Sequence, residues 1–456
     1  MTFIPSPRIT PRLTPRLTRR RAVGIATATA LPLVHIRTAG AAGTVSIGFW
    51  DHWVPAGNAI MKKQALAWGE KNKVEVKMDF ITTVGAKLTL TQAAEALAKT
   101  GHDVITFRDW EVQNHAAALE PVDDVMKMLT DKYGAVTEIH AYLAKSGGAW
   151  RAVPTSSGSN YKGPCARISL LKQHAGIDVT AMFPARAETA PSAANWTYDT
   201  HLKAAEACHK AGVPFGIGVG STVDSVDTAG AILRAYGAEL VDIKGTIQVK
   251  SDAMRQVLEH AQRLVRFLPS DAPSYDDASN NKALIAGKSA LIWNPPSAYA
   301  VAKRDAPDVA ADCWSFPAPA GPAGRFTPAG PYFWGIWQFA KNKSAAKDLI
   351  THLSERENAE ERCAGVEGFD VPPFADMLNF KVWDDVGPPK GTMFNYPLRS
   401  FHNAKPHIAG YPAPPEIAVQ AYQRGTAPAM FARLMRGDSI ANVTDWAAKE
   451  LEGFTR

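Results

Sequence analysis

The residues best suited to chemistry in this chain are tryptophans that are followed by charged or amide side chains. Twelve tryptophans occur in 456 residues, and several end predicted strands, in Trp50-Asp51-His52-Trp53, Arg108-Asp109-Trp110-Glu111 and Trp293-Asn294. An indole ring stacks on the apolar face of a sugar, and neighbouring polar side chains hydrogen-bond its hydroxyls. A single tryptophan is more often a core residue, but this set, together with Trp334, predicts a ligand-binding cleft.

Sequence motifs of catalysis and metal binding are missing. The chain contains no HExxH or GxSxG motif, and its histidines are not paired beside a carboxylate at a metal-binding spacing. Gly287-Lys288-Ser289 resembles the end of a phosphate-binding loop, but Lys282 occupies the position of the required first glycine. The segment Gly216–Ser221 lacks the last glycine of a dinucleotide motif. We therefore expect no enzyme activity, no cofactor and no metal.

Adjacent acidic pairs occur three times. Neighbouring residues point in different directions on a helix or strand, so such a pair is poorly placed to act as an acid and a base on one substrate. We interpret them as solvated surfaces or helix starts. The pairs are Asp123-Asp124, Asp276-Asp277 and Asp384-Asp385.

The elements that must position the tryptophans alternate between strand and helix. Apolar and alternating patterns predict strands at 44–50, 74–81 and 103–107, with helices at 59–72 and 87–99 between them. This order predicts a parallel sheet, whose ligands bind at the carboxyl ends of the strands. Those ends carry the segments Trp50–Trp53 and Arg108–Glu111.

The aromatic stretch from Gly324 to Leu353 predicts a buried strand that leads into a helix. Successive side chains on a strand point to opposite faces. We therefore expect Tyr332 and Trp334 to face the cleft and Phe333 to face the core.

The net charge of +6 comes from the N-terminus. Seven arginines and no acidic residue precede Thr44, and the remaining chain carries 43 basic against 44 acidic residues. This near-neutral balance gives no support for nucleic-acid binding. The arginines, an apolar run and a small-residue patch predict an export signal at residues 1–43, of the twin-arginine type and cleaved near residues 41–43. A disordered basic tail or an organelle transit peptide is the alternative.

Four cysteines, Cys165, Cys208, Cys313 and Cys363, form no CxxC pair. An oxidising compartment would permit disulfides, but spacing does not choose among the three connectivities, and buried thiols are equally compatible.

Several segments, in this order, resemble the extracellular solute-binding proteins of bacterial ABC importers, of the larger kind related to maltose-binding protein. In the stretch from Gly321 onward, which resembles the family's third crossover between lobes, Gly330-Pro331-Tyr332 replaces the usual Gly-Gly. The matching segments are GAWRAVP at 148–154, the helix at 196–212, AGAILRAYGAELVD at 229–242, LIAGKSAL at 284–291 and the stretch from Gly321 onward.

This resemblance implies an α/β fold of two lobes, the type II periplasmic-binding-protein fold, with several hinge crossings. By analogy, residues 44–153 plus 293–325 form the N-terminal lobe and residues 154–292 plus 326–456 form the C-terminal lobe. The resemblance also implies a monomer that delivers a solute to a membrane permease. It adds His52, Asn160, Tyr161 and Asp224 to the ligand-binding residues expected above.

A sugar or polyol is the ligand that the tryptophans favour. A polyamine, a phosphorylated polyol or an amino-acid derivative is the alternative on the same fold, because Asp51, Glu111 and Asp224 together would suit a cation. An exported enzyme on a two-lobe scaffold is a third hypothesis.

Overall fold

The computed structural model describes residues 43–158, 160–184, 188–294, 297–385 and 402–454. All of these lie in one unit of the chain, Ala41–Arg456. Apart from Gly43, the predicted export signal lies outside the described residues.

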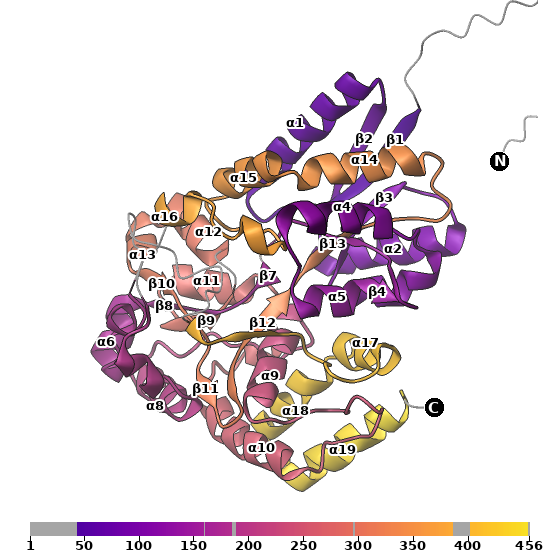
Figure 1. Ribbon diagram of the computed structural model, residues 1–456. Coiled ribbons are helices and arrows are strands. Elements are labelled where there is room, and N and C mark those ends of the chain that lie inside the picture. The colour runs from indigo at the N-terminus through magenta and orange to yellow at the C-terminus, as the bar shows by residue number, and fades with distance from the viewer. Residues whose placement is uncertain (1–42, 159, 185–187, 295–296, 386–401, 455–456) are drawn as a thin grey trace, which may run out of the picture. The chain divides into compact units, whose positions relative to one another are not determined.

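Helices and strands alternate through the first third of the chain, as expected, and helices dominate the rest (Figure 1). The strands are β1 (Thr44–Trp50), β2 (Glu75–Ile81), β3 (Val104–Arg108), β4 (Lys145–Ser146), β5 (Ala149–Trp150), β6 (Val153–Pro154), β7 (Asn160–Tyr161), β8 (Pro164–Arg167), β9 (Leu291–Trp293), β10 (Cys313–Ser315), β11 (Ala320–Gly321), β12 (Gly324–Gly330), β13 (Tyr332–Ile336) and β14 (Lys405–His407). The α-helices are α1 (Pro55–Asn72), α2 (Lys87–Ala98), α3 (Glu111–His115), α4 (Asp123–Tyr133), α5 (Glu138–Ala144), α6 (Ile168–Ala175), α7 (Val179–Met182), α8 (Tyr198–Lys210), α9 (Val223–Ala235), α10 (Asp252–Leu264), α11 (Ser279–Ile285), α12 (Ser297–Asp305), α13 (Pro307–Ala311), α14 (Lys343–Ser354), α15 (Arg356–Gly365), α16 (Val382–Asp385), α17 (Pro415–Gln423), α18 (Thr426–Met435) and α19 (Ile440–Glu452).

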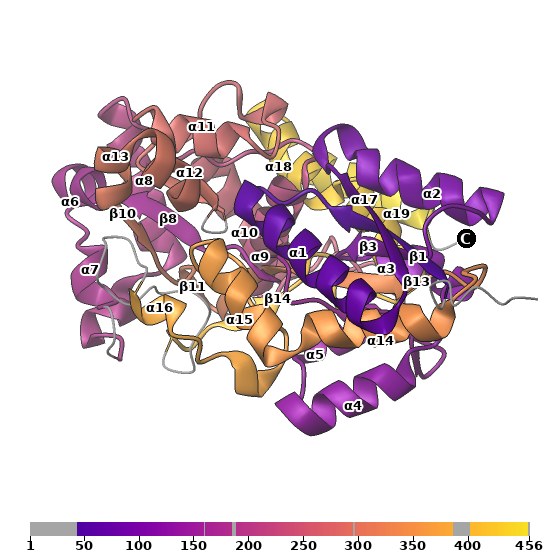
Figure 2. The ribbon, with the colours of Figure 1, turned by 90° about the horizontal axis from the view of Figure 1, so that it is seen from above.

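The first sheet has the strand order β2-β1-β3-β13-β6. β1 pairs in parallel with both β2 and β3, so the predicted parallel arrangement of the first three strands is confirmed. β13 runs antiparallel to β3 and β6, with Trp334 opposite Thr106 and Val153. We call this sheet with helices α1 to α5, α14 and α15 the first lobe; α1 lies beside α14 and α15 (Figure 2).

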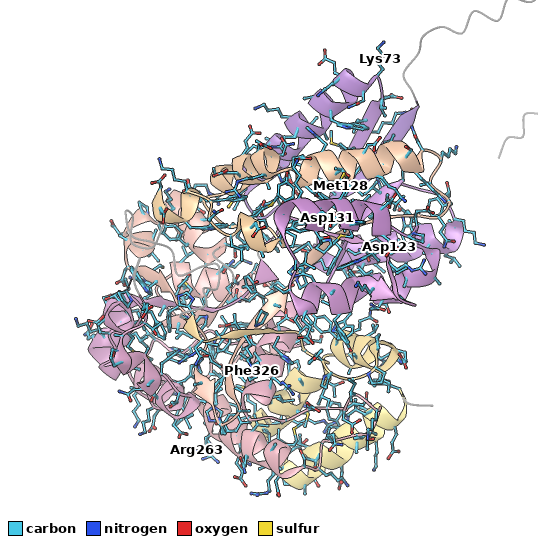
Figure 3. All side chains as sticks on the ribbon, viewed as in Figure 1. Lys73, Asp123, Met128, Asp131, Arg263 and Phe326 are labelled. Carbon is cyan, nitrogen blue, oxygen red and sulfur yellow. The ribbon has the colours of Figure 1, made fainter. Side chains whose placement is uncertain are left out.

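The second lobe is built on two smaller sheets. One has the order β10-β8-β9, and the other joins β11, β12 and β14, with β7 paired to β12. Helices α8 to α10, α18 and α19 pack against one another around them. Phe326, near the start of β12, lies in this lobe (Figure 3), where the Arg234 guanidinium covers its ring at 5.6 Å.

The chain crosses between the two lobes at places that differ in part from the expected division. One crossing runs from β6 to β7, which belong to different sheets. Residues 293–325 were expected in the first lobe, yet β10 pairs with β8 of the second lobe. Residues from 326 onward were expected in the second lobe, yet β13 pairs with β3 of the first. Each strand belongs to the lobe of the strands with which it pairs, and these partners lie more than 140 residues away in the sequence. The crossing therefore falls at Gly330–Tyr332, between β12 and β13.

Helix starts follow the sequence closely. Thr197 and Ser251 cap α8 and α10 by accepting hydrogen bonds from the backbone N–H groups of Thr200 and Met254. Gly176 ends α6 in the left-handed conformation, at φ 68°. In the described part of the chain, we find no helix that combines the length and the apolar character needed to span a membrane.

Candidate functional site

A cavity with a volume of about 690 Å³ is lined from both lobes. The first lobe contributes Trp53, the turn before α2 and the segment Arg108–Glu111. The second lobe contributes the start of α9, the segment Asp276–Ala278 and Tyr422. The cavity thus lies at the carboxyl end of β3, where parallel α/β sheets bind ligands.

The turn after β3 forms the floor of the cavity. Asp109 has a φ of 46°, which is uncommon outside glycine and marks a constrained backbone. Its N–H donates to the carbonyl of Pro331 at 3.0 Å, which fixes the turn against the crossing between β12 and β13. The Asp109 side chain is 4% exposed, and its Oδ1 has no hydrogen-bond partner. This oxygen is enclosed by protein atoms rather than open to the cavity.

Arg108 lies beside Asp109 and covers an aromatic ring. Its guanidinium carbon is 5.0 Å from the centre of the Tyr332 ring, and Nη2 is 3.9 Å from Oδ2 of Asp109. Burial acts to lower the pKa of Arg108, but Tyr332, Asp109 and Asp277 outweigh it and raise that pKa well above its usual value. Arg108 is therefore a fixed cation on the cavity floor.

A buried ion cluster supports the second-lobe wall of the cavity. Lys162 Nζ lies 2.6 Å from Asp227 Oδ2 and 3.2 Å from Asp224 Oδ1. Tyr422, which lines the cavity, donates its hydroxyl to Asp227 Oδ1 at 2.9 Å. Burial acts to lower the pKa of Lys162, but the nearby carboxylates raise it, whereas burial raises the pKa of Asp227 to about 7. Lys162 therefore stays protonated and holds Asp224 and Asp227 in place.

Glu111 lines the cavity, but the protein already satisfies its carboxylate. It accepts hydrogen bonds from Thr89 Oγ1 at 2.5 Å, Gln92 Nε2 at 3.0 Å and the N–H of Arg108 at 2.7 Å. Burial raises the pKa of Glu111, although these donors oppose the shift. This residue mainly fixes the turn that carries Arg108 and Asp109.

Two of the predicted tryptophans reach the cavity. Trp53 is half-buried on its wall. Trp110 is almost fully buried, and its Nε1 donates to the carbonyl of Ala409 at 2.8 Å, which connects the two lobes. Both rings have the flat apolar surface that stacks on a sugar.

The other predicted residues of the first lobe lie outside the lining of this cavity. Trp50 packs on Tyr332 with ring centres 4.6 Å apart. His52 pairs with Asp370 at 2.9 Å inside the protein, and the exposed Asp51 accepts from Asn58 at 2.6 Å. Trp334 packs on Phe49.

The orientation expected for Trp334 differs from the one observed. The ring is 1% exposed and lies in the core of the first lobe rather than at the cavity. The pleat of β13 directs the Trp334 ring toward Phe49 of β1. There the ring is buried in a large apolar cluster, which is favourable because its apolar surface is shielded from water. Phe333 is also in the core, as predicted.

The predicted residues of the second lobe lie behind the cavity wall. Asn294 is buried and donates to Asp224 and to Asn280. Trp293 and Tyr161 are buried, and Asn160 pairs through its backbone with Gly330. Asp224 follows Val223, which lines the cavity.

Five residues of the site were missing from the sequence-based selection, namely Arg108, Asp109, Lys162, Asp277 and Tyr422. Asp109 lies inside a segment that the strand pattern had located, and its position after a strand end was an available signal. Asp277 belongs to a pair interpreted as a helix start. Its neighbour Asp276 does accept the N–H of Ala278, but both carboxylates also line the cavity.

Known proteins match most of this chain. A sequence profile of the bacterial extracellular solute-binding proteins covers residues 63–387. The chain belongs to this family. A probable ABC transporter-binding protein of Deinococcus radiodurans is 30% identical over 132 residues, or 28% of this chain. The match spans 30% of the length of that curated relative.

Solved structures share the fold of this solute-binding protein at low sequence identity. Maltose-bound MalE3 of T. maritima is 17% identical with a TM-score of 0.69, over 90% of this chain and 100% of that one. A putative oligosaccharide periplasmic-binding protein of Synechococcus sp. MITs9220 is 16% identical with a TM-score of 0.72, over 90% and 98%. A sugar transporter from Arthrobacter chlorophenolicus A6, with bound laminaribiose, is 14% identical with a TM-score of 0.69, over 90% and 99%. The predicted two-lobe α/β periplasmic-binding-protein fold is confirmed.

The described residues of this solute-binding protein contain no group of three or more histidine, cysteine or acidic side chains arranged to hold a metal ion. All four cysteines are free and buried. The cavity lining combines aromatic rings, carboxylates, the guanidinium of Arg108 and the ammonium group of Lys282, a set that suits reversible binding through stacking and hydrogen bonds.

Proposed function

We propose that this protein is the substrate-binding component of an ABC importer and holds a sugar or polyol in the interlobe cavity. The observation that carries the proposal is the cavity itself. Its volume of about 690 Å³ falls within the range of about 300–1,000 Å³ that is typical of small-molecule sites. Two indole rings, a guanidinium and several carboxylate residues line the same space.

The proposed ligand-binding residues are Trp53, Trp110, Arg108 and Asp109. The tryptophans would stack on the apolar faces of the sugar, while Asp109 accepts hydroxyl hydrogens and Arg108 donates to ring or hydroxyl oxygens. Relatives with this fold support a carbohydrate, because their names include maltose, laminaribiose and chitin oligosaccharide.

Delivery to the permease follows from closure of the two lobes. We propose that the crossings at β6–β7 and β12–β13 act as a hinge, and that the ligand favours the closed form by contacting both lobes. The protein would be exported to the periplasm by its first 43 residues, act as a monomer and release its ligand unchanged at the permease. The ABC transporter name of the Deinococcus radiodurans relative supports this setting.

Isothermal titration tests the proposal. The exported protein is first unfolded and refolded to remove bound solute, and the released compound is identified by mass spectrometry. The refolded protein is then titrated with maltose, laminaribiose, tagatose, galactose and chitin oligosaccharides. We expect saturable binding of at least one carbohydrate with 1:1 stoichiometry. A released non-sugar compound and no carbohydrate binding would contradict the proposed ligand class, and conversion of the bound compound would indicate an enzyme.

A further inference from the structure

Strands β8 and β10 of the second lobe bring two cysteines onto one face of their sheet. Cys165 of β8 lies opposite Ser315, and Cys313 of β10 lies opposite Arg167. Residues opposite each other on antiparallel strands share a face of the sheet, and so do residues two apart on one strand. Cys165 and Cys313 are therefore diagonal neighbours on the same face, although they lie far apart in the sequence.

The thiols of these two cysteines are in contact. The Cys313 thiol forms a hydrogen bond with that of Cys165, and its Sγ also donates to the carbonyl of Val309 at 3.2 Å. Both side chains are 0% exposed and belong to one apolar cluster. A disulfide requires cysteines on neighbouring backbone segments whose side chains point at each other. Cys165 and Cys313 meet both conditions.

The other two cysteines lie elsewhere in the protein. Cys208 is on α8, in a different apolar cluster from Cys165 and Cys313. Cys363 is on α15 of the first lobe, where its Sγ donates to the carbonyl of Asp370 at 3.0 Å. Of the three connectivities that four cysteines allow, the one that joins contacting thiols pairs Cys165 with Cys313. It leaves Cys208 and Cys363 in separate lobes.

We propose that Cys165 and Cys313 form a disulfide in the exported protein, whereas Cys208 and Cys363 remain thiols. This inference rests on the export that is part of the proposed function, because disulfides persist in oxidising compartments. It does not depend on the ligand. The bond joins β8, which follows the first crossing between the lobes, to β10, and it closes a loop that contains helices α6 to α13.

The bond forms by thiol–disulfide exchange with a disulfide oxidant, either an oxidoreductase or oxidised glutathione. One thiolate of the pair attacks the oxidant's disulfide and releases one of its sulfurs, and the second thiolate then displaces the other. Two S–H bonds are broken and one S–S bond is made. The two electrons and two protons pass to the oxidant, whose disulfide becomes two thiols.

Burial determines when this exchange takes place. The thiolate is the reactive form, but the hydrogen bond with Cys165 and burial both raise the pKa of Cys313. Neither thiol has exposed surface in the folded protein. The exchange therefore accompanies folding or local opening of the second lobe, and the test includes a refolding step.

Peptide mapping tests the pairing directly. The protein is reduced in denaturant and refolded with reduced and oxidised glutathione. Free thiols are then blocked with iodoacetamide in denaturant, and the protein is digested with trypsin without reduction. We expect peptide 163–167 to be joined to peptide 305–325, and Cys208 and Cys363 to carry the blocking group. Four blocked cysteines, or a bond to either of the other two, would overturn the inference.

The same map of protein isolated from the exporting cell separates the inference from the proposed export. The linked peptides in both samples would support the pairing and the oxidising compartment. Linked peptides in the refolded sample alone would support the pairing and contradict the proposed export. A failure to bind carbohydrate would leave either result unchanged.

Thermal unfolding measures the effect of the bond. We expect the oxidised protein to melt about 2–5 °C higher than the same protein with a reducing agent. Cys165→Ala and Cys313→Ala should abolish this difference. Cys208→Ala, which removes a buried cysteine of the same lobe, is the matched control and should keep it. A difference that persists in Cys165→Ala would overturn the inference, and the peptide map decides the question if these variants fail to fold.

Discussion

Lys162 Nζ lies 2.6 Å from Asp227 Oδ2 in the interior of the second lobe, so the crossing after β6 is fastened to α9 by a buried ion pair. The Lys162 side chain is 5% exposed and that of Asp227 is 0% exposed. Asp224 shares the same ammonium group at 3.2 Å. A cluster of this kind fixes the second-lobe wall of the cavity, and its removal tests that role.

Lys162→Met should lower the free energy of unfolding by about 3–5 kcal/mol at neutral pH, because two buried carboxylates lose their cation. Urea unfolding followed by circular dichroism measures the change. The double variant Lys162→Met/Asp227→Asn should recover part of the loss, since one buried charge is then removed with its partner. Equal losses in the single and double variants would contradict the ion-pair account.

The sequence predicted those parts of the fold that depend on neighbouring residues. The β-α-β order of the first three strands follows from short patterns, and Thr197, Ser251 and Gly176 are residue types that favour the helix ends at which the structure has them. The boundary between the lobes does not, because β10 joins β8 and β13 joins β3 through pairings between distant segments. No local sequence pattern specifies the strand with which a short apolar segment will pair.

In the candidate site, too, features set by neighbouring residues could be predicted and contacts between distant segments could not. The loop from Arg108 to Glu111 was located by its position after a strand, and Trp53 and Trp110 line the cavity. Trp334 has the same local pattern but is covered by Phe49, which is 285 positions away. Lys162 and Asp227 are separated by 65 positions, so their pairing could not be found from composition or spacing.

Trp53→Ala should weaken binding of the tightest carbohydrate about 5- to 100-fold, because an aromatic ring that stacks on the ligand is lost. Its half-buried position predicts little change in the free energy of unfolding. Titration calorimetry measures the affinity. Trp446→Ala is the control, since that ring is also half-buried but lies on α19 beneath Arg433, at 4.4 Å. Similar affinities for the two variants would remove Trp53 from the site.

Gly158→Ala should disturb the first crossing between the lobes. The residue has a φ of 119°, and an added Cβ would lie 2.4 Å from Cδ2 of Tyr332, the ring that Arg108 covers. We expect a loss of about 1–3 kcal/mol in the free energy of unfolding together with weaker ligand binding. Gly147→Ala separates backbone strain from the clash, because Gly147 has a φ of 60° and no atom within 4 Å of the added Cβ. Equal effects of both substitutions would show that contact with Tyr332 is unimportant.

Because His201 is buried, we expect the second lobe to lose stability at acidic pH. The side chain is buried among Trp196, Phe215 and Trp293, and burial lowers its pKa to about 3. The unfolded chain takes up a proton near pH 6.5 and the folded protein does not, so the stability that His201 contributes is present above pH 6.5. It is lost progressively as the pH falls toward 3.

The free energy of unfolding should therefore fall by about 2 kcal/mol between pH 7 and pH 5 through this residue. His201→Leu should flatten the pH dependence by that amount, whatever its effect at pH 7, because leucine does not titrate. Urea unfolding at a series of pH values measures the slope, with the half-buried His174→Leu as the control. An unchanged slope in His201→Leu would mean that the folded protein accommodates a charged imidazole at this position.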